Sequence, residues 1–169
     1  MSNKGEISFH EVQPARMWWA WLIILAIAAF AWWSFIVQIV FETPVGTNPA
    51  SDAVVVVIWV AFGIEFPLFF YSVKLITDVR TDGIYVRLFP VWSRAVALKD
   101  IVRSDPRRYR PLVDYGGWGI RFGGHKKRAY NMSGNRGVEL ELTDGTHLLI
   151  GSQRPEELAS AINTAKAYP

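Results

Sequence analysis

Residues 17–41 form an apolar run of twenty-five residues, in which Ser34 and Gln38 are the only polar members. A helix rises about 1.5 Å per residue, so this run spans a hydrocarbon core of roughly 30 Å with some tilt. A cleaved signal peptide is the alternative, but its apolar stretch is usually shorter, and here Trp32 and Trp33 follow the only small-residue run. We therefore predict a transmembrane helix that stays in the mature chain.

A second apolar run, residues 53–76, is interrupted only by Glu65, Ser72 and Lys74. Lys74 is close enough to the end of the run for its ammonium group to reach the lipid headgroups. We predict a second transmembrane helix here.

The connector between the two runs carries Thr, Pro, Gly, Asn and Ser and has no Lys or Arg, which favours a turn joining two antiparallel helices. Sixteen of the eighteen Lys and Arg residues lie from Lys74 onward, and the other two, Lys4 and Arg16, precede the first run. The positive-inside rule then places both termini in the cytoplasm, and we expect a multi-pass protein of a prokaryotic plasma membrane. The predicted organisation is a cytoplasmic segment 1–16, helices 17–41 and 53–76 joined by an external loop 42–52, and a cytoplasmic domain 77–169.

Glu65 and Gln38 are the polar residues of most interest within the predicted membrane segments. A carboxylate near the middle of a bilayer is costly and often marks an ion path or a buried partner contact. The alternative is a structural Glu65 that an indole N–H or Ser34 satisfies, packed within the hairpin or against another copy. Pro67 lacks an N–H, so we expect it to leave a backbone carbonyl open for a polar group.

After the second run the pattern changes to alternation of apolar and polar side chains, which predicts strands at 75–80 and 84–89. Asp82 and Gly83 lie between them, and an Asp-Gly turn between alternating runs predicts a hairpin. The same construction recurs around Asp144 and Gly145. The remaining expected strands, of an all-β meander, are 94–98, 101–104, 117–122, 128–131, 138–142 and 146–150, with Leu140 and Leu142 facing the core.

The chain ends in a pattern typical of one amphipathic helix. Ser152 is suited to cap its start and Pro155 to its first turn. Leu158 and Ile162 are one turn apart and predict the buried stripe.

Short strands followed by one C-terminal helix are the order of a pleckstrin-homology-like barrel, in which the helix plugs an open end. The chain resembles bacterial pleckstrin-homology-like domains in TDGIYVRLFP (81–90), GGWGIRFGG (116–124), AYNMSGNRGVELEL (129–142) and LLIGSQRPEELASAI (148–162). The whole chain, with FHEVQ at 9–13, resembles a family of small prokaryotic membrane proteins for which no activity or ligand is known. The resemblance implies an α+β membrane protein: a two-helix transmembrane hairpin followed by a small antiparallel β-barrel capped by a helix. It carries over no functional residue.

Catalytic chemistry finds little support in the sequence. There is no cysteine, which excludes disulfides and thiolate sites. His10, His125 and His147 lack paired metal-ligand spacing, and Ser133 lacks a nucleophile elbow. We therefore predict neither an enzyme nor a metal or other cofactor.

Basic residues are the best surface signal. Residues 78–169 hold fifteen Lys and Arg against ten Asp and Glu, which favours attraction to an anionic leaflet. They gather in two clusters that we predict to bind lipid or a partner: Arg107, Arg108 and Arg110 around Tyr109, and Lys126, Lys127 and Arg128 after His125. The alternative is that both are solvated loops obeying the positive-inside bias. Nucleic acid is not an expected partner, because no recognised nucleic-acid module surrounds these residues.

Two functional hypotheses follow. The first is a non-enzymatic membrane adaptor or accessory subunit, whose basic domain binds anionic lipid, a partner protein or another copy of itself. The second is an oligomeric transporter or channel element in which Glu65 and Gln38 line a path.

Overall fold

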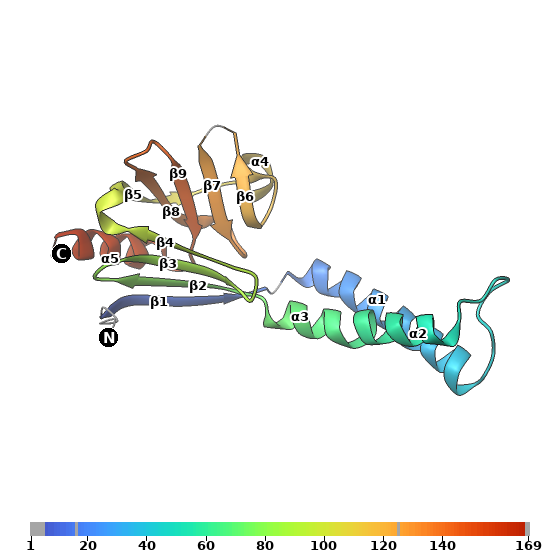
Figure 1. The fold of residues 1–169 in the computed structure, drawn as a ribbon. Coiled ribbons are helices and arrows are strands. Elements are labelled where there is room, and N and C mark those ends of the chain that lie inside the picture. The colour runs from blue at the N-terminus through green and yellow to red at the C-terminus, as the bar shows by residue number, and fades with distance from the viewer. Residues whose placement is uncertain (1–5, 16, 125, 168–169) are drawn as a thin grey trace. The chain divides into compact units, whose positions relative to one another are not determined.

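The computed structural model describes residues 6–15, 17–124 and 126–167 (Figure 1). The chain divides into two compact units. The helical hairpin is Arg16–Ser72, and the remainder, up to Ala15 and from Val73 onward, forms an α+β unit. The α+β unit thus includes residues on both sides of the hairpin, whereas the predicted domain began at residue 77.

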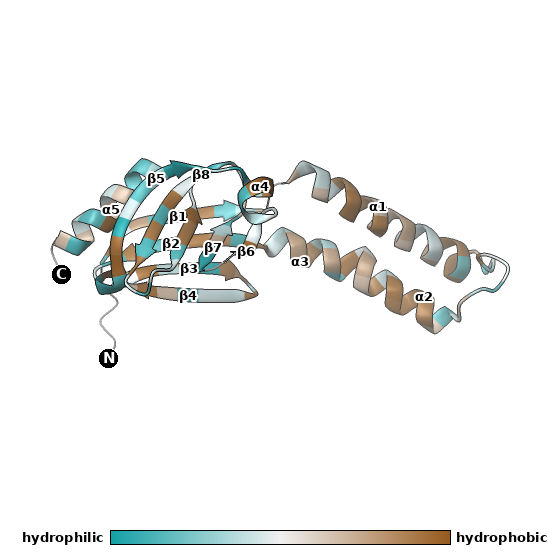
Figure 2. Cartoon of the chain, turned by 90° about the horizontal axis from the view of Figure 1, so that it is seen from above, coloured by the Kyte–Doolittle hydropathy of each residue, from teal (hydrophilic) through white to brown (hydrophobic). Residues whose placement is uncertain are grey.

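The hairpin consists of two long apolar helices (Figure 2). The first runs through α1 (Trp18–Phe35) and the π-helical turn η1 (Ile36–Val40), and the second through α2 (Asp52–Ile58), η2 (Trp59–Glu65) and α3 (Phe66–Ser72). Both are long and apolar enough to cross a membrane. The second ends at Ser72 rather than at residue 76, because Leu75 and its neighbours pair in a sheet.

The first sheet is a four-stranded antiparallel sheet in the order β1-β2-β3-β4. Its strands are β1 (Ile7–Pro14), β2 (Lys74–Arg80), β3 (Gly83–Phe89) and β4 (Trp92–Ala97). Strand β1 was not predicted; it lies within the segment 1–16 that was expected to precede the first helix. The β2–β3 hairpin around Asp82 and Gly83 is confirmed.

The second sheet has five strands in the order β5-β8-β9-β7-β6. They are β5 (Ile101–Arg108), β6 (Gly119–Gly123), β7 (Lys127–Asn131), β8 (Arg136–Leu142) and β9 (His147–Gly151). The predicted hairpin around Asp144 and Gly145 is present as β8–β9, but β7 and β9 pair in parallel. Because β8 inserts between β5 and β9, and neither sheet closes on itself, the predictions of a meander and of a closed barrel are wrong.

The core of the α+β unit is formed by the inner faces of the sheets and by α5 (Pro155–Ala167), which contacts strands of both. Leu158 and Ile162 are fully buried, as predicted, and so is Leu140 of β8, while the inward-facing Leu142 is 6% exposed. Two short elements complete the unit: the 3-10 turn η3 (Leu98–Asp100) and the helix α4 (Pro111–Tyr115).

Candidate functional site

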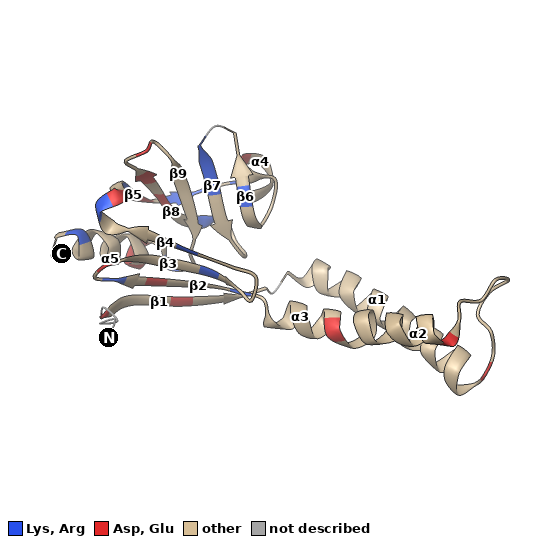
Figure 3. Ribbon diagram, in the orientation of Figure 1, with Lys and Arg blue, Asp and Glu red and all other residues tan. Residues whose placement is uncertain are grey.

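The two predicted basic clusters lie at different places on the second sheet (Figure 3). Arg107 on β5 aligns with Gly137 and through it with Gly151, whereas Lys127 on β7 aligns with His147. His147 and Gly151 are at opposite ends of β9, and β5 and β7 are separated by two strands. With strand spacings of about 4.8 Å and a rise of about 3.3 Å per residue, the clusters are roughly 20 Å apart. They do not form one patch.

Arg107 is already paired. Its Nη1 donates to Oε2 of Glu139 at 2.5 Å, and that hydrogen bond and charge raise the pKa of the Arg107 guanidinium. His147 Nδ1 lies 3.8 Å from the other oxygen of Glu139. The positive charge of Arg107 is therefore largely compensated on the outer face of the sheet.

Arg108 and Arg110 are exposed, and their guanidinium groups form no ion pair with any residue that the structure describes. Both line an open hollow of about 380 Å³, together with Tyr109, Val113, Asp114 and Asn135. The Asp114 carboxylate accepts the backbone N–H of Arg110 at 2.8 Å, which fixes the start of α4. Two cations and one hydrogen-bonded carboxylate thus surround the hollow, an arrangement suited to an anionic group.

Tyr109 forms the floor of this hollow rather than an exposed ring. Its side chain is 4% exposed and packs with Tyr115, Ala129 and Leu149. Burial raises the pKa of the Tyr109 hydroxyl, so the ring stays neutral at physiological pH. The hollow therefore rests on a buried aromatic side chain.

The second cluster does not converge. Lys126 Nζ donates to the carbonyl of Asp144 at 2.6 Å, and the Arg128 guanidinium stacks over the Phe122 ring at 5.7 Å from its centre. Hydrogen bonds from Thr146, and more weakly the nearby basic groups, lower the pKa of Asp144, so a carboxylate stands beside these cations. Lys127 is exposed.

Glu65 and Gln38 are not brought together. Gln38 Nε2 donates to the carbonyl of Ala50 at 2.7 Å and to Asp52 Oδ1 at 2.9 Å, so it closes the loop end of the hairpin. The Glu65 side chain is exposed and forms no hydrogen bond or ion pair with any other described residue. Glu65 lies thirteen positions after Asp52 along the helix, which is roughly 20 Å.

The carbonyl of Gly63, four residues before Pro67, accepts a side-chain hydrogen bond from the other helix. Trp32 Nε1 donates to it at 3.1 Å, joining the two helices. The Trp32 indole N–H therefore binds a backbone carbonyl and not the Glu65 carboxylate.

The sequence of this chain matches, over residues 2–168, the family described as "Family of unknown function (DUF6141)". The chain belongs to this family. No curated protein and no solved structure matches it. The match covers both units, so the hairpin and the α+β unit are one family architecture, and membership in DUF6141 assigns no ligand or activity.

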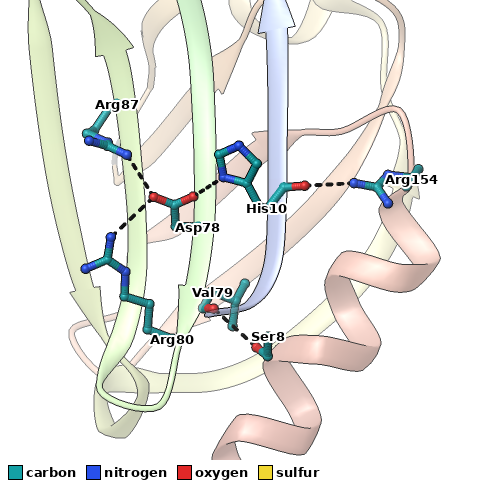
Figure 4. A network of polar contacts seen from close by, with 7 residues as sticks. All are labelled: Ser8, His10, Asp78, Val79, Arg80, Arg87 and Arg154. Carbon is teal, nitrogen blue, oxygen red and sulfur yellow. Dashed lines mark hydrogen bonds and ion pairs between the residues drawn. The ribbon is translucent and has the colours of Figure 1, made fainter. Parts of the chain in front are cut away.

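Sequence reasoning missed a polar cluster of this DUF6141 chain on the outer face of the first sheet (Figure 4). The carboxylate of Asp78, 2% exposed, lies 2.6 Å from His10 Nδ1, 2.9 Å from Arg87 Nη2 and 3.5 Å from Arg80 Nη2. Arg154 Nη2 donates to the His10 carbonyl at 2.8 Å and its guanidinium covers the Phe9 ring. Only a strand assignment for residues 7–14, which places His10 beside Asp78, would have revealed it.

A metal centre finds no support in the parts of the chain that are described. No three His, Asp or Glu side chains there are grouped to hold an ion. His10 and His147 lie on different sheets, and His125 is outside the described residues.

Proposed function

We propose that this DUF6141 chain is a non-enzymatic membrane adaptor, anchored by its hairpin, whose α+β unit lies on the cytoplasmic leaflet and binds an anionic lipid headgroup between Arg108 and Arg110. The pair of unpaired arginines around one hollow is the observation that carries the lipid part of the proposal.

The anchor is supported by how little of the helices the chain itself covers. In the most apolar stretch of each helix, 22% and 11% of the residues are buried. A core helix of a water-soluble protein is mostly covered, whereas here Phe30 and Leu68 are each 63% exposed. Lipid is the cover that we propose for these helices.

The orientation is supported by charge. Residues 17–72 contain Glu42, Asp52 and Glu65 but no Lys or Arg (Figure 3). The basic α+β unit therefore belongs on the side of the membrane that retains positive charge, which is the cytoplasmic side.

The headgroup site is supported by the geometry of its cations. Arginine presents a planar fork of N–H groups that suits phosphate oxygens, and a basic residue near an anionic leaflet contributes about 1 kcal/mol. Because neither Arg108 nor Arg110 has a carboxylate partner for its guanidinium among the described residues, binding a phosphate breaks no ion pair.

Native mass spectrometry of the full chain in mixed micelles tests the site. We expect more phosphatidylglycerol than phosphatidylcholine to stay bound, and we expect this preference to be lost in Arg108→Ala/Arg110→Ala. Lys127→Ala/Arg128→Ala removes the same charge from the other cluster and is expected to retain the preference. Equal loss in both double variants, or no preference in the native chain, contradicts a headgroup site at the hollow.

The adaptor part is tested separately. The full chain is purified from native membranes in a gentle detergent, and the proteins that accompany it are identified by mass spectrometry. Recovery of the chain alone counts against a protein partner.

An oligomeric ion path is the second candidate, because Glu65 is an exposed carboxylate within an apolar helix. Gln38, the other residue expected to line the path, instead forms hydrogen bonds at the loop end of the hairpin. Ion flux into liposomes discriminates the two functions: flux that Glu65→Ala abolishes favours a path, and equal background flux from both chains removes it.

A further inference from the structure

We infer that the α+β unit has a second, apolar contact with the bilayer: the β3–β4 turn and helix α4 insert their exposed side chains into the headgroup region of the leaflet that holds the hairpin. This inference rests on the membrane anchor proposed above.

The first step is where the chain leaves the α+β unit. The backbone N–H of Ala15 donates to the Val73 carbonyl at 3.1 Å, so the two chain segments that connect the α+β unit to the hairpin start side by side. The helices begin at Trp18 and end at Ser72. Three residues of chain reach about 10 Å at most, so this end of the first sheet stays near the membrane surface whatever the angle between the units.

The β3–β4 turn lies at this same end. Pro14, Lys74 and Phe89 are aligned as the last row of β1, β2 and β3, and β3 runs toward that row. The turn therefore projects beyond it. Phe89 is 48% exposed and Val91 64% exposed, and the Lys74 ammonium lies 5.4 Å from the centre of the Phe89 ring.

Helix α4 is tied to the same end through β1. Gln13 Nε2 donates to the Gly151 carbonyl at 2.8 Å, and a Cβ added at Gly151 would lie 3.4 Å from the hydroxyl oxygen of Tyr109, two residues before α4. Figures 1 and 2 both show α4 at the end of the α+β unit from which the chain leaves. Leu112 is 67% exposed and Val113 75% exposed.

The chemistry of this end fits the membrane–water interface. Exposed apolar side chains flanked by cations are the pattern of elements that lie in the headgroup region. Here the cations are Lys74, Arg108 and Arg110. By contrast, the β2–β3 and β8–β9 turns carry Asp82 and Asp144 and no large apolar side chain.

Lipid, rather than a protein partner, is the occupant because the chain itself holds this surface against the bilayer. A protein bound there would have to displace lipid beside the two chain segments that connect the α+β unit to the hairpin. We therefore expect the contact in the purified chain, in lipid alone.

The absence of cysteine from the sequence permits a direct test with single labels. Nitroxides are attached to Val91→Cys and Val113→Cys in the full chain, reconstituted in nanodiscs of phosphatidylcholine and phosphatidylglycerol. Phe30→Cys, in the middle of α1, reports the anchor, and Thr81→Cys, in the β2–β3 turn, reports bulk water. Collision rates with oxygen and with a water-soluble nickel complex give the depth of each label.

The expected result is a nickel collision rate several-fold lower at residues 91 and 113 than at residue 81. Rates at 91 and 113 equal to that at 81, with the label at residue 30 shielded, overturn the inference and leave the anchor standing. Shielding at only one of the two sites overturns the two-point contact. An exposed label at residue 30 refutes the anchor itself. Phe89→Cys and Leu112→Cys are second positions in the same elements if a first label disturbs folding.

Discussion

Glu11 and Ser152 are 141 residues apart in sequence, yet the Ser152 hydroxyl donates to Glu11 Oε2 at 2.5 Å in the interior of the α+β unit. The other carboxylate oxygen accepts the backbone N–H of Gln153 at 2.7 Å. The Ser152 hydroxyl in turn accepts the N–H of Arg154 at 3.0 Å, just before α5 begins. One side chain from β1 therefore fixes the connection between β9 and α5.

We predict that Glu11→Ala lowers the free energy of unfolding of the α+β unit by about 2 kcal/mol, because it leaves a buried hydroxyl and a partly buried N–H without their acceptor. Glu11→Gln keeps one acceptor and is expected to cost about half as much. Thermal unfolding of the full chain in detergent, followed by near-ultraviolet circular dichroism, measures both. Val12→Thr, at the exposed neighbouring position, is the control, and a loss as large as that of Glu11→Ala would contradict the assignment.

A second prediction concerns Asp78, whose carboxylate is buried among His10, Arg80 and Arg87. Asp78→Asn keeps the size of the side chain but leaves the two arginines without their counter-charge. Removing one partner of a fully buried pair costs 3–5 kcal/mol; since His10 and Arg87 are about half exposed, we expect about 2 kcal/mol. Asp82→Asn changes an exposed carboxylate that accepts the Tyr85 hydroxyl, and it should cost well under 1 kcal/mol. Equal losses would show that the cluster on Asp78 adds no stability.

What the sequence could predict was set by local chemistry. The turns at Asp82–Gly83 and Asp144–Gly145 depend only on a few adjacent residues, and both predicted hairpins are present in the structure. Strand β1 escaped prediction because two of its inward-facing side chains, Glu11 and Gln13, are polar and find their partners at residues 151–153. The apolar alternation that marks a half-buried strand is therefore missing from its inner face.

The candidate site was predicted only in part, for a similar reason. Arg107, Arg108 and Arg110 are neighbours in sequence, but Glu139, brought beside Arg107 by the β5–β8 pairing, compensates the first of them. Strand β8 inserts between β5 and β9, and β7 pairs with β9 in parallel. Both pairings join strands that are distant in sequence, so local sequence patterns do not predict them. The separation of the two basic clusters follows from that strand order.

A third prediction tests the strand order at Gly137, near the start of β8. A Cβ there would overlap the carbonyl oxygen of Ile150 and lie 3.1 Å from the Cα of Gly151, both backbone atoms of β9. We expect Gly137→Ala to cost about 3 kcal/mol, because the β8–β9 pair must separate to admit the methyl group. At Gly123 the nearest atom to an added Cβ is 3.4 Å away, so Gly123→Ala is the matched control and should cost little by comparison. Hydrogen exchange of the β8 and β9 amides reports the difference, and protection that is unchanged in Gly137→Ala would refute the close approach.

The last prediction concerns the hairpin, where the Trp32 indole donates to the Gly63 carbonyl, four residues before Pro67. Hydrogen bonds between membrane helices are worth on average about 0.6 kcal/mol, so we expect Trp32→Phe to destabilise the hairpin by about 1 kcal/mol once the change in packing is included. Pro67→Ala restores a backbone N–H within reach of that carbonyl. In the Pro67→Ala background Trp32→Phe should therefore cost distinctly less, and the double-mutant cycle isolates this coupling from packing. Unfolding of the hairpin by sodium dodecyl sulfate, measured for all four chains, gives the cycle. Strictly additive costs would mean that the indole and the proline act independently, and that the 3.1 Å contact contributes no stability as a hydrogen bond.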